Sequence, residues 1–159
     1  MKTTVDQRGI TLVETLLATA IAAMIVGLLG STIFLFMRST EQGNKQLIAF
    51  QDLQNAGHWI TRDGMAAQTT GLADGAAPVV SMTLSWTDGE QSNTVTYSLS
   101  GDDLRRNYNG TVMTVARNVS SVGFSISQRV ITSNMTSAPA GRWGASKDAT
   151  YKVRLRPTG

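Results

Sequence analysis

Side chains suited to catalysis are sparse in this sequence of 159 residues. The only histidine is His58, there is no cysteine, and no serine lies in a G-x-S-x-G pattern. A catalytic triad needs a base beside its nucleophile, and His58 lies in a predicted helix where a packing or surface role is expected. No glycine-rich loop has the Lys-Ser/Thr ending that binds phosphates. We therefore predict that the chain is not an enzyme and binds no cofactor.

Two acidic pairs carry oxygens of the kind that Ca²⁺ prefers. They are Asp88/Glu90 and Asp102/Asp103, and each adjoins a glycine. Asp and Gly are also the residues that tight turns favour, so turn formation explains both pairs without a metal. We predict no metal site in this chain.

The basic residues are spread along the chain apart from two concentrations. These are Arg105-Arg106 and the alternating series Lys152, Arg154 and Arg156. The net charge is only +3, although the computed isoelectric point is 9.6. Such a balance is typical of a solvated surface, and nucleic acid is not an expected partner.

A carboxylate inside a long apolar run is the most unusual feature of the sequence. The run from Ile10 to Met37 has 28 residues, and Glu14 carries its only charge. About 20 apolar residues cross a bilayer core, so the run predicts a transmembrane helix. A charge near the centre of such a helix costs on the order of 2.5–3.5 kcal/mol, and less near its end. Glu14 is therefore a functional-site candidate, paired with a cation such as an α-amino group; alternatively it snorkels to the interface or is protonated.

Residues 1–9 form a short polar leader before this run. Lys2 and Arg8 outnumber Asp6, and positive residues before a span favour a cytoplasmic N-terminus. An ordinary secretory signal has an apolar core of about 7–15 residues and a small-residue cleavage site. The run here is longer, although the small residues at 19–23 leave a conventional signal peptide open as an alternative.

The hexapeptide GITLVE at Gly9–Glu14, preceded by Arg8 and followed by the apolar run, resembles the prepilin motif of type IV pilins and type II secretion pseudopilins. The resemblance implies cleavage after Gly9 by a prepilin peptidase and N-methylation of the new terminus at Ile10. Glu14 would become the fifth residue of the mature chain, the acidic position of the family. Its partner would be the terminus of a neighbouring subunit. Ile10 departs from the usual phenylalanine or methionine.

Other features are similar to the minor, J-type subunits of this family. The span has no proline, whereas major pilins commonly carry one there. The segment QDLQNAGHWITRDG at 51–64 resembles the end of the long helix in J-type minor pseudopilins. The segment LRRNYNGTVMTVARNVSSVGFSISQ at 104–128 is similar to their sheet.

The family resemblance also implies partners and a location. We expect contacts with other pilin or pseudopilin subunits through the helix, with the prepilin peptidase, with an inner-membrane assembly platform and with lipid. The expected location is the inner membrane, in a single pass with the N-terminus inside and the C-terminal domain outside. The implied function is assembly into a pilus-like or pseudopilus filament, near its tip.

The helical pattern continues beyond the apolar run. Apolar residues recur at helical spacing at Leu47, Phe50, Leu53, Gly57 and Ile60. We predict one helix from about residue 11 to residue 62 or slightly beyond, about 75 Å long at 1.5 Å per residue. The predicted division is a leader at 1–9, a transmembrane helix at 10–37, its continuation at 38–66 and a β domain at 67–159.

After a Gly/Ala-rich loop at 64–78, apolar residues alternate with polar ones, which predicts strands. The predicted strands are 80–86, 94–99, 104–108, 111–116, 122–130 and 151–155, with a long polar loop at 132–149. Asp88-Gly89 and Asn109-Gly110 are hairpin signals. This order predicts an α+β, pilin-like fold in which an antiparallel sheet packs on the second half of the helix.

Two other function classes stay open. A single-span membrane-anchored receptor would capture a ligand with its β domain while the helix serves only as an anchor. An anchored enzyme would need a cluster of polar side chains in a pocket. Cleavage after Gly9 is expected only of the pilin class, so the mature N-terminus distinguishes these alternatives.

Overall fold

The computed structural model describes residues 11–142 and 145–157. Within them a single helix, α1 (Leu12–Ala66), precedes all the strands, and the strands pair antiparallel in two sheets. This confirms the predicted α+β class, with a long N-terminal helix packed on antiparallel strands. The chain divides into two compact units, which we call the apolar unit (Met1–Thr40) and the sheet unit (Glu41–Gly159).

In the apolar unit, local sequence explains where α1 begins and why it continues. The Oγ1 atom of Thr11 accepts a hydrogen bond from the backbone N–H of Glu14 (3.3 Å), which makes Thr11 an N-cap. No proline interrupts the helix, and leucine and alanine, both strong helix formers, are frequent in it. Every described residue from 11 to 40 is exposed.

In the sheet unit, one stripe of α1 is buried under the strands. Its apolar members are Ala49, Leu53, Ala56 and Ile60. They recur every three or four residues, as a single helix face requires. Two of the four are alanines, so the backbone of α1 lies close to the strands that cover it.

The position of the stripe differs in part from the prediction. Leu53, Gly57 and Ile60 are buried as expected. The prediction was wrong for Leu47 and Phe50, whose side chains are 54% and 51% exposed. The covering strands pack against the face that carries the small alanines, and this face is rotated away from the two larger side chains.

The first sheet has five strands in the order β1-β2-β3-β4-β5. These strands are β1 (Thr69–Thr70), β2 (Ser81–Asp88), β3 (Gln91–Ser100), β4 (Asp103–Tyr108) and β5 (Thr111–Ala116). Successive strands are neighbours, so the sheet is a meander. Its hairpin turns lie where the sequence predicts them, and Asn109 (φ 47°) and Gly110 (φ 93°) adopt the left-handed backbone of a two-residue turn.

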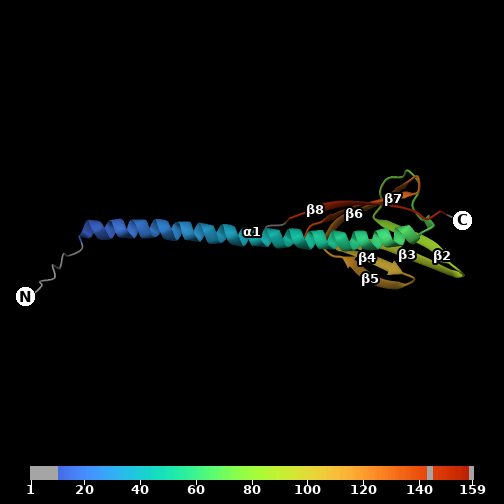
Figure 1. Ribbon diagram of the computed structural model, residues 1–159, viewed down its shortest axis with the longest axis horizontal. Helices are drawn as coiled ribbons and strands as arrows, with labels where there is room; N and C mark the ends of the chain where they lie inside the picture. Colours follow the sequence, from blue (N-terminus) through green and yellow to red (C-terminus); the bar gives the residue numbers. More distant parts are fainter. Residues whose placement is uncertain (1–10, 143–144, 158–159) are drawn as a thin grey trace, which may run out of the picture. The chain divides into compact units, whose positions relative to one another are not determined.

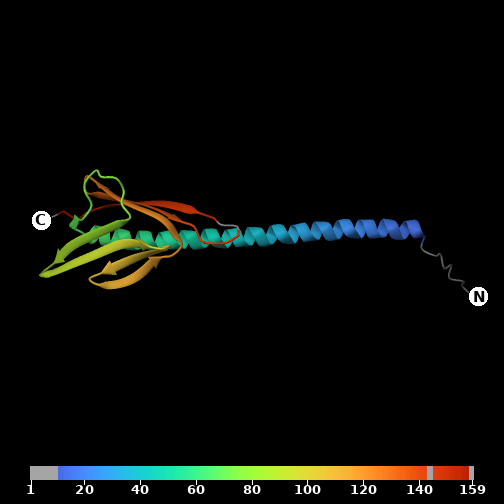
Figure 2. The same cartoon turned by 180° about the vertical axis from the view of Figure 1, so that it is seen from behind.

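The second sheet has three strands in the order β6-β7-β8. These are β6 (Val119–Ser127), β7 (Val130–Ser137) and β8 (Lys147–Arg154). In both views of the sheet unit, β2–β5 lie on one side of α1 and β6–β8 on the other (Figure 1, Figure 2). The single predicted sheet is therefore two sheets.

The predicted loop at 132–149 is wrong at both of its ends, because β7 continues to Ser137 and β8 begins at Lys147. Gln128 (φ 50°) and Arg129 (φ 64°) form a turn, and β7 follows at once in antiparallel register with β6. Ser133 and Ser137 are buried at positions where the alternating pattern would normally carry apolar residues. Because small hydroxyl side chains occupy core positions, the strand looks like a polar loop in the sequence.

One hydrophobic core joins α1 to both sheets. Ile60 of the helix belongs to it with Leu84 of the first sheet and Ile131 of the second. Across the core, the rings of Tyr97 and Phe124 lie with their centroids 6.4 Å apart. The two sheets and the second part of the helix therefore form one structural unit.

Candidate functional site: the apolar helix and its attachment to the sheets

The predicted processing site lies outside the described residues. Gly9 and Ile10 precede the first described residue, so cleavage and N-methylation stay predictions. Glu14 lies in the first turn of α1 with an exposed side chain. The spacing from Thr11 to Glu14 is that of a capping box, and a carboxylate near a helix N-terminus interacts favourably with the helix dipole. Glu14 thus has a local structural role that any assembly role must be separated from.

The first part of α1 presents a continuous apolar surface. Leu12 is 78% exposed, and Leu28 and Phe36 are still 68% and 71% exposed further along. It is the one helix within the described residues that is long and apolar enough to cross a membrane, and it lies near the N-terminus. An exposed apolar surface of this extent needs a lipid or protein environment. It is suited to a single-pass membrane anchor.

Five hydroxyl groups in this part of the helix, those of Thr15, Thr19, Ser31, Thr32 and Thr40, donate to backbone carbonyls of the helix or its cap. Thr19 Oγ1 donates to the carbonyl of Leu16 (2.9 Å), and Thr32 Oγ1 donates to that of Leu28 (2.8 Å). Such bonds remove the penalty of placing a hydroxyl in an apolar medium. Among the described residues from 11 to 37, Glu14 is the one with a formal charge.

At the other end of α1, a buried carboxylate binds the helix to the first sheet. Asp63 is 3% exposed and accepts two hydrogen bonds from Arg106 of β4, from Nε to Oδ2 (2.6 Å) and from Nη2 to Oδ1 (2.9 Å). The Tyr97 hydroxyl of β3 donates to the same Oδ2. A bidentate pair of this kind fixes both the position of the helix along its axis and its rotation about that axis, relative to the sheet.

The electrostatics of this cluster keep Tyr97 and Arg106 each in one protonation state. Burial, and next the hydrogen bond to Asp63, raise the pKa of the Tyr97 hydroxyl far above its usual value. The hydrogen bond to Asp63 also raises the pKa of Arg106. Tyr97 therefore stays a neutral donor and Arg106 a cation, so the cluster has the character of a structural link and not of an acid–base site.

Aromatic rings enclose the guanidinium of Arg106. Its Cζ lies 4.8 Å from the ring centroid of Trp59 on α1 and 4.9 Å from that of Tyr108 on β4. Trp86 stacks on Tyr108 with a centroid distance of 6.0 Å. Cation–π contacts offset part of the desolvation of a buried cation. They make Arg106 the centre of the contact between helix and sheet.

The second sheet approaches α1 at two glycines spaced seven residues apart. A Cβ atom on Gly57 would overlap the ring of Tyr151, and one on Gly64 would lie 2.5 Å from Cγ1 of Val153. The hydroxyl of Tyr151 donates to the carbonyl of Leu53 (2.9 Å). Larger residues at these two positions would push β8 away from the helix.

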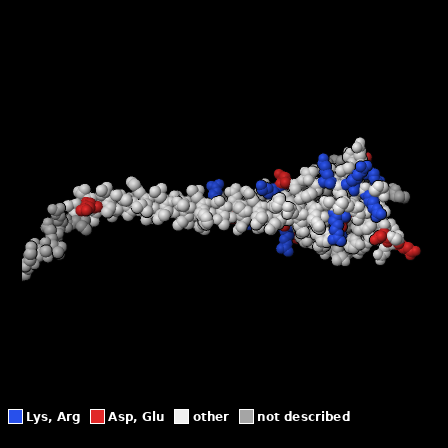
Figure 3. Space-filling model, viewed as in Figure 1, with Lys and Arg blue, Asp and Glu red and all other residues white. Residues whose placement is uncertain are grey.

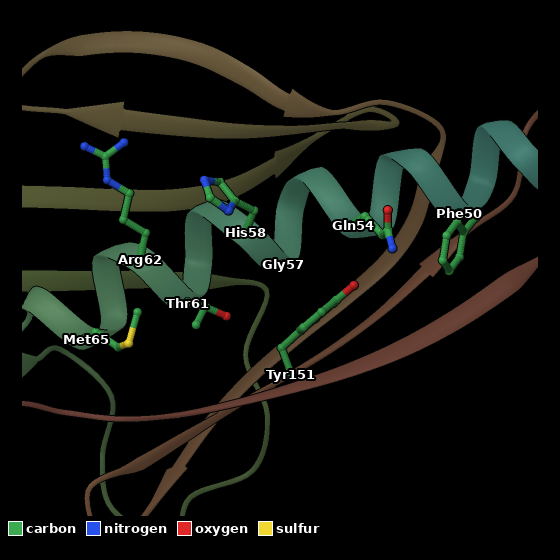
Figure 4. Close-up of a pocket in the computed structure, with 8 residues that line it drawn as sticks. All are labelled: Phe50, Gln54, Gly57, His58, Thr61, Arg62, Met65 and Tyr151. Atoms are coloured by element: carbon green, nitrogen blue, oxygen red, sulfur yellow. The ribbon is translucent and has the colours of Figure 1, made fainter.

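A groove of about 640 Å³ runs beside this contact (Figure 4). It is lined by Phe50, Gln54, Gly57, His58, Thr61, Arg62, Met65 and Tyr151. Phe50 and Met65 lie on the same side of the helix as Tyr151, whereas His58 and Arg62 point away from it (Figure 4). His58 is exposed and packs edge-on against Trp59, with the ring centroids 6.1 Å apart.

The acidic pairs lie at turns. Asp88 ends β2, Glu90 follows Gly89, and both side chains are exposed. Asp102 and Asp103 lie where β4 begins. Across the described ranges, 11–142 and 145–157, no three His, Cys, Asp or Glu side chains come together as potential metal ligands.

Sequence reasoning identified Glu14 and missed the cluster of Asp63, Tyr97 and Arg106. A signal for Asp63 exists, because it lies three residues after Ile60 and thus continues the buried stripe. Its partners are 34 and 43 residues away in sequence, so no local pattern identifies them. No known protein-family model matches this chain, and no curated protein matches it.

Proposed function

We propose that this protein is a minor pilin or pseudopilin subunit that assembles through its apolar helix into a type IV pilus-like or type II secretion pseudopilus filament. The observation that carries the proposal is a single helix, α1, with two different surroundings. Its first part exposes apolar side chains after a prepilin-like motif, and its second part is attached to two antiparallel sheets. A simple membrane anchor would need the exposed apolar side chains, but it would not need the prepilin-like motif.

Assembly follows a defined order in this proposal. A prepilin peptidase removes residues 1–9 at the cytoplasmic side of the inner membrane, and the new terminus at Ile10 is methylated. The α-amino group then pairs with Glu14 of a neighbouring subunit, since an uncompensated carboxylate in lipid is unfavourable. An assembly platform in the membrane moves the subunit from lipid to the filament, and the sheets remain outside.

The apolar surface of α1 supports this transfer. Leucine and phenylalanine side chains are in an apolar environment both in lipid and in a bundle of apolar helices. Moving the subunit from lipid to the filament therefore exposes little apolar surface to water. Specificity must then come from polar groups and close packing. Glu14 supplies the polar group, and Gly27 and Gly30, each with open space where a Cβ would lie, supply positions at which another helix backbone approaches closely.

The mature N-terminus tests the proposal. Mass spectrometry of the protein purified from its native membrane should identify a chain that begins with N-methylated Ile10. Gly9→Leu should abolish this processing, while Gly30→Leu, a matched glycine replacement inside the span, should leave it intact. An intact Met1, or cleavage at another bond, would refute the pilin assignment.

Glu14 needs a test that separates its charge from its capping role. Glu14→Gln retains the capping-box residue type but removes the charge, whereas Thr11→Ala removes the cap and retains the charge. Glu14→Gln should insert in the membrane and be processed, yet no longer co-purify with its partner subunits. Thr11→Ala should co-purify normally. The opposite pattern would assign Glu14 to helix capping alone.

A membrane-anchored binding module is the second candidate function. The groove beside Tyr151, with polar Gln54, His58 and Arg62 along it, is the observation that favours it. In this case the helix would only anchor, and replacement of residues 1–37 by an unrelated transmembrane segment would preserve function. The pilin proposal expects the same replacement to abolish assembly.

A further inference from the structure

The two sheets formed by the described residues have four edge strands, β1 and β5 in the first sheet and β6 and β8 in the second. A sheet edge with unpaired backbone groups can bind another strand, so folded proteins usually protect their edges. β1 is only two residues long. β8 carries charged side chains, which are a common protection of an open edge, at Lys147, Asp148, Lys152 and Arg154.

The outer edge of β6 is covered by the segment that precedes β2. The N–H of Val79 donates to the carbonyl of Phe124 (2.9 Å), and the N–H of Phe124 donates to the carbonyl of Val79 (2.8 Å). The N–H of Gly75 donates to the carbonyl of Ile126 (2.9 Å). Three of the four edge strands are therefore short, charged or covered.

The fourth edge strand, β5, has none of these protections. It has six residues, TVMTVA, without a charge or a proline. It forms the margin of the first sheet, and no other strand among the described residues pairs with its outer side (Figure 1). The side chains of Val112 and Met113, on its two faces, are 57% and 37% exposed. β5 is thus an open and uncharged edge with apolar side chains.

The register of β5 shows which of its backbone groups are free. Tyr108 and Thr111 flank a two-residue turn and form a hydrogen-bonded pair, and such pairs alternate along an antiparallel ladder. Met113 therefore bonds to β4, whereas the N–H and C=O groups of Val112 and Thr114 point away from it. Within the described residues, no hydrogen bond reaches these outward groups. They are the groups with which an added strand would pair.

An aromatic ring of α1 lies beside this open edge. Asn55 and Trp59 are four residues apart and so share one face of the helix. The amide of Asn55 donates to the carbonyl of Val115 (2.6 Å). Trp59 is partly buried, and its ring centroid lies 4.8 Å from Cζ of Arg106, which is directly opposite Met113 in the sheet. Met113 and Trp59 therefore offer an apolar contact to side chains that an added strand directs inward.

The surroundings of the edge are basic. Arg105 of β4 lies directly opposite Thr114, and its side chain is exposed. Arg117, just after β5, is also exposed. Within the part of the chain that the structure describes, neither arginine forms an ion pair. Basic side chains also predominate on the face of the sheet unit seen in Figure 3. This charge distribution favours a segment that carries carboxylates.

We propose that β5 binds an extended acidic segment of a different polypeptide, which adds a strand to the first sheet. Backbone bonds to Val112 and Thr114 supply the pairing, as in other cases of β-strand addition. Apolar side chains of the segment point inward to Met113 and Trp59, and its acidic side chains lie on the outer face beside Arg105.

A second copy of this chain is a poorer occupant of the edge. Its β5 would bring an uncharged strand and another Arg105 to the contact, so the charges would not be complementary. The inference goes beyond the proposed function. It concerns the sheet unit alone and holds whether α1 assembles with other helices or serves only as an anchor.

Binding of two synthetic peptides to the detergent-solubilised full chain tests the proposal. One eight-residue peptide alternates valine with glutamate, and the other alternates valine with lysine. Fluorescence anisotropy of the labelled peptides should show that the glutamate peptide binds about tenfold more tightly. When it binds, amide hydrogen exchange should slow at Val112 and Thr114 and stay unchanged in β8.

Substitutions in the chain locate the binding. Thr114→Pro removes an outward N–H without removing a bond to β4, so it should weaken binding of the glutamate peptide about tenfold. Thr114→Val keeps this N–H and is the matched control, with binding equal to that of the parent. Arg105→Glu should weaken binding of the same peptide about fivefold. Arg154→Glu on β8 makes the same change in net charge and should have no effect.

N-methylated peptides keep the test decisive even where Thr114→Pro does not fold. In the proposed register the glutamate N–H groups face β5 and the valine N–H groups face solvent, because the direction of the backbone groups alternates along a strand together with the side chains. N-methylation of the glutamates should therefore abolish binding. N-methylation of the valines should preserve it.

Each contrary result overturns a stated part of the proposal. Absence of binding by the glutamate peptide at millimolar concentration overturns it, as does binding at parental strength to Thr114→Pro. Equal effects of the two N-methylations overturn the backbone pairing. Self-association of the full chain that Thr114→Pro abolishes would identify a second copy as the occupant and overturn the choice of a different polypeptide. None of these results bears on the mature N-terminus, which tests the proposed function separately.

Discussion

Leucines in the two parts of α1 have different surroundings, since Leu28 is 68% exposed and Leu53 is 2% exposed. Glycines differ in the same way. Gly27 has open space where a Cβ would lie, whereas a Cβ on Gly57 would overlap Tyr151. Helix propensity is equal within each pair, so the difference arises from what covers the helix. The side chains of the first part of α1 are exposed, whereas the sheet unit uses the second part of the helix in its own core.

This contrast predicts which substitutions affect folding of the sheet unit, and Asp63→Ala should have the largest effect. It leaves the Arg106 cation buried without its carboxylate and removes the acceptor of the Tyr97 hydroxyl. Loss of one partner of a buried pair costs about 3–5 kcal/mol in the free energy of unfolding. Urea unfolding of the detergent-solubilised full chain, followed by tryptophan fluorescence, measures it. Asp88→Ala is the exposed control, and a similar loss in both variants would contradict the prediction.

The matched pair Leu53→Ala and Leu28→Ala tests burial directly. Leu53→Ala should lower the free energy of unfolding of the sheet unit by about 2–5 kcal/mol, because it leaves a cavity between α1 and the sheets. Leu28→Ala should leave the same transition within about 0.5 kcal/mol of the parent. Equal effects would show that the first part of the helix also contributes to the core.

The glycine pair tests close approach. Gly57→Ala should destabilise the sheet unit by about 1–3 kcal/mol because Tyr151 must move. Gly27→Ala should cause no loss, because alanine is the better helix former and nothing opposes its methyl group. Unfolding in urea compares the two variants. A stabilising Gly57→Ala would show that β8 is free to shift.

The smallest effect concerns pH. Burial raises the pKa of Tyr97 and of Tyr151 in the folded chain. The unfolded chain releases these protons near pH 10, whereas the folded chain still holds them at that pH. The free energy of unfolding therefore has its full value below about pH 10 and decreases as the pH rises above it. Tyr97→Phe should lower stability by about 1–2 kcal/mol at neutral pH and weaken the alkaline decline. An unchanged decline would assign the pH dependence to other groups.

The helix and the hairpins with Gly-containing turns were predictable because their signals are local. A 28-residue apolar run and the turn residues Asn109-Gly110 determine structure from the sequence nearby. Strand β7 was not predictable in this way, because Ser133 and Ser137 occupy core positions that normally carry apolar residues. A strand is predicted from the alternation of apolar and polar residues, so a buried serine is counted as polar. Ser133 and Ser137 are small enough to be buried although they are polar.

In the candidate site too, features with a local signal were predictable from the sequence and contacts between distant residues were not. Glu14 is a candidate from its apolar surroundings in the sequence alone, and its role in assembly stays a prediction. The attachment of α1 to the sheets has no such signal, because Asp63 meets Tyr97 and Arg106 only after β3 and β4 have paired. Cleavage after Gly9 and methylation at Ile10 stay predictions, since both residues precede the described part of the chain.

The attachment of α1 at Asp63 has a mechanical consequence. A force along the helix axis would act on contacts at two positions of α1, namely the Arg106 and Tyr97 bonds to Asp63 and the bond from Tyr151 to Leu53. Bonds loaded together share the tension, whereas bonds opened one after another bear it singly. Because these contacts join α1 to both sheets, pulling the helix out of the sheet unit requires them to break together.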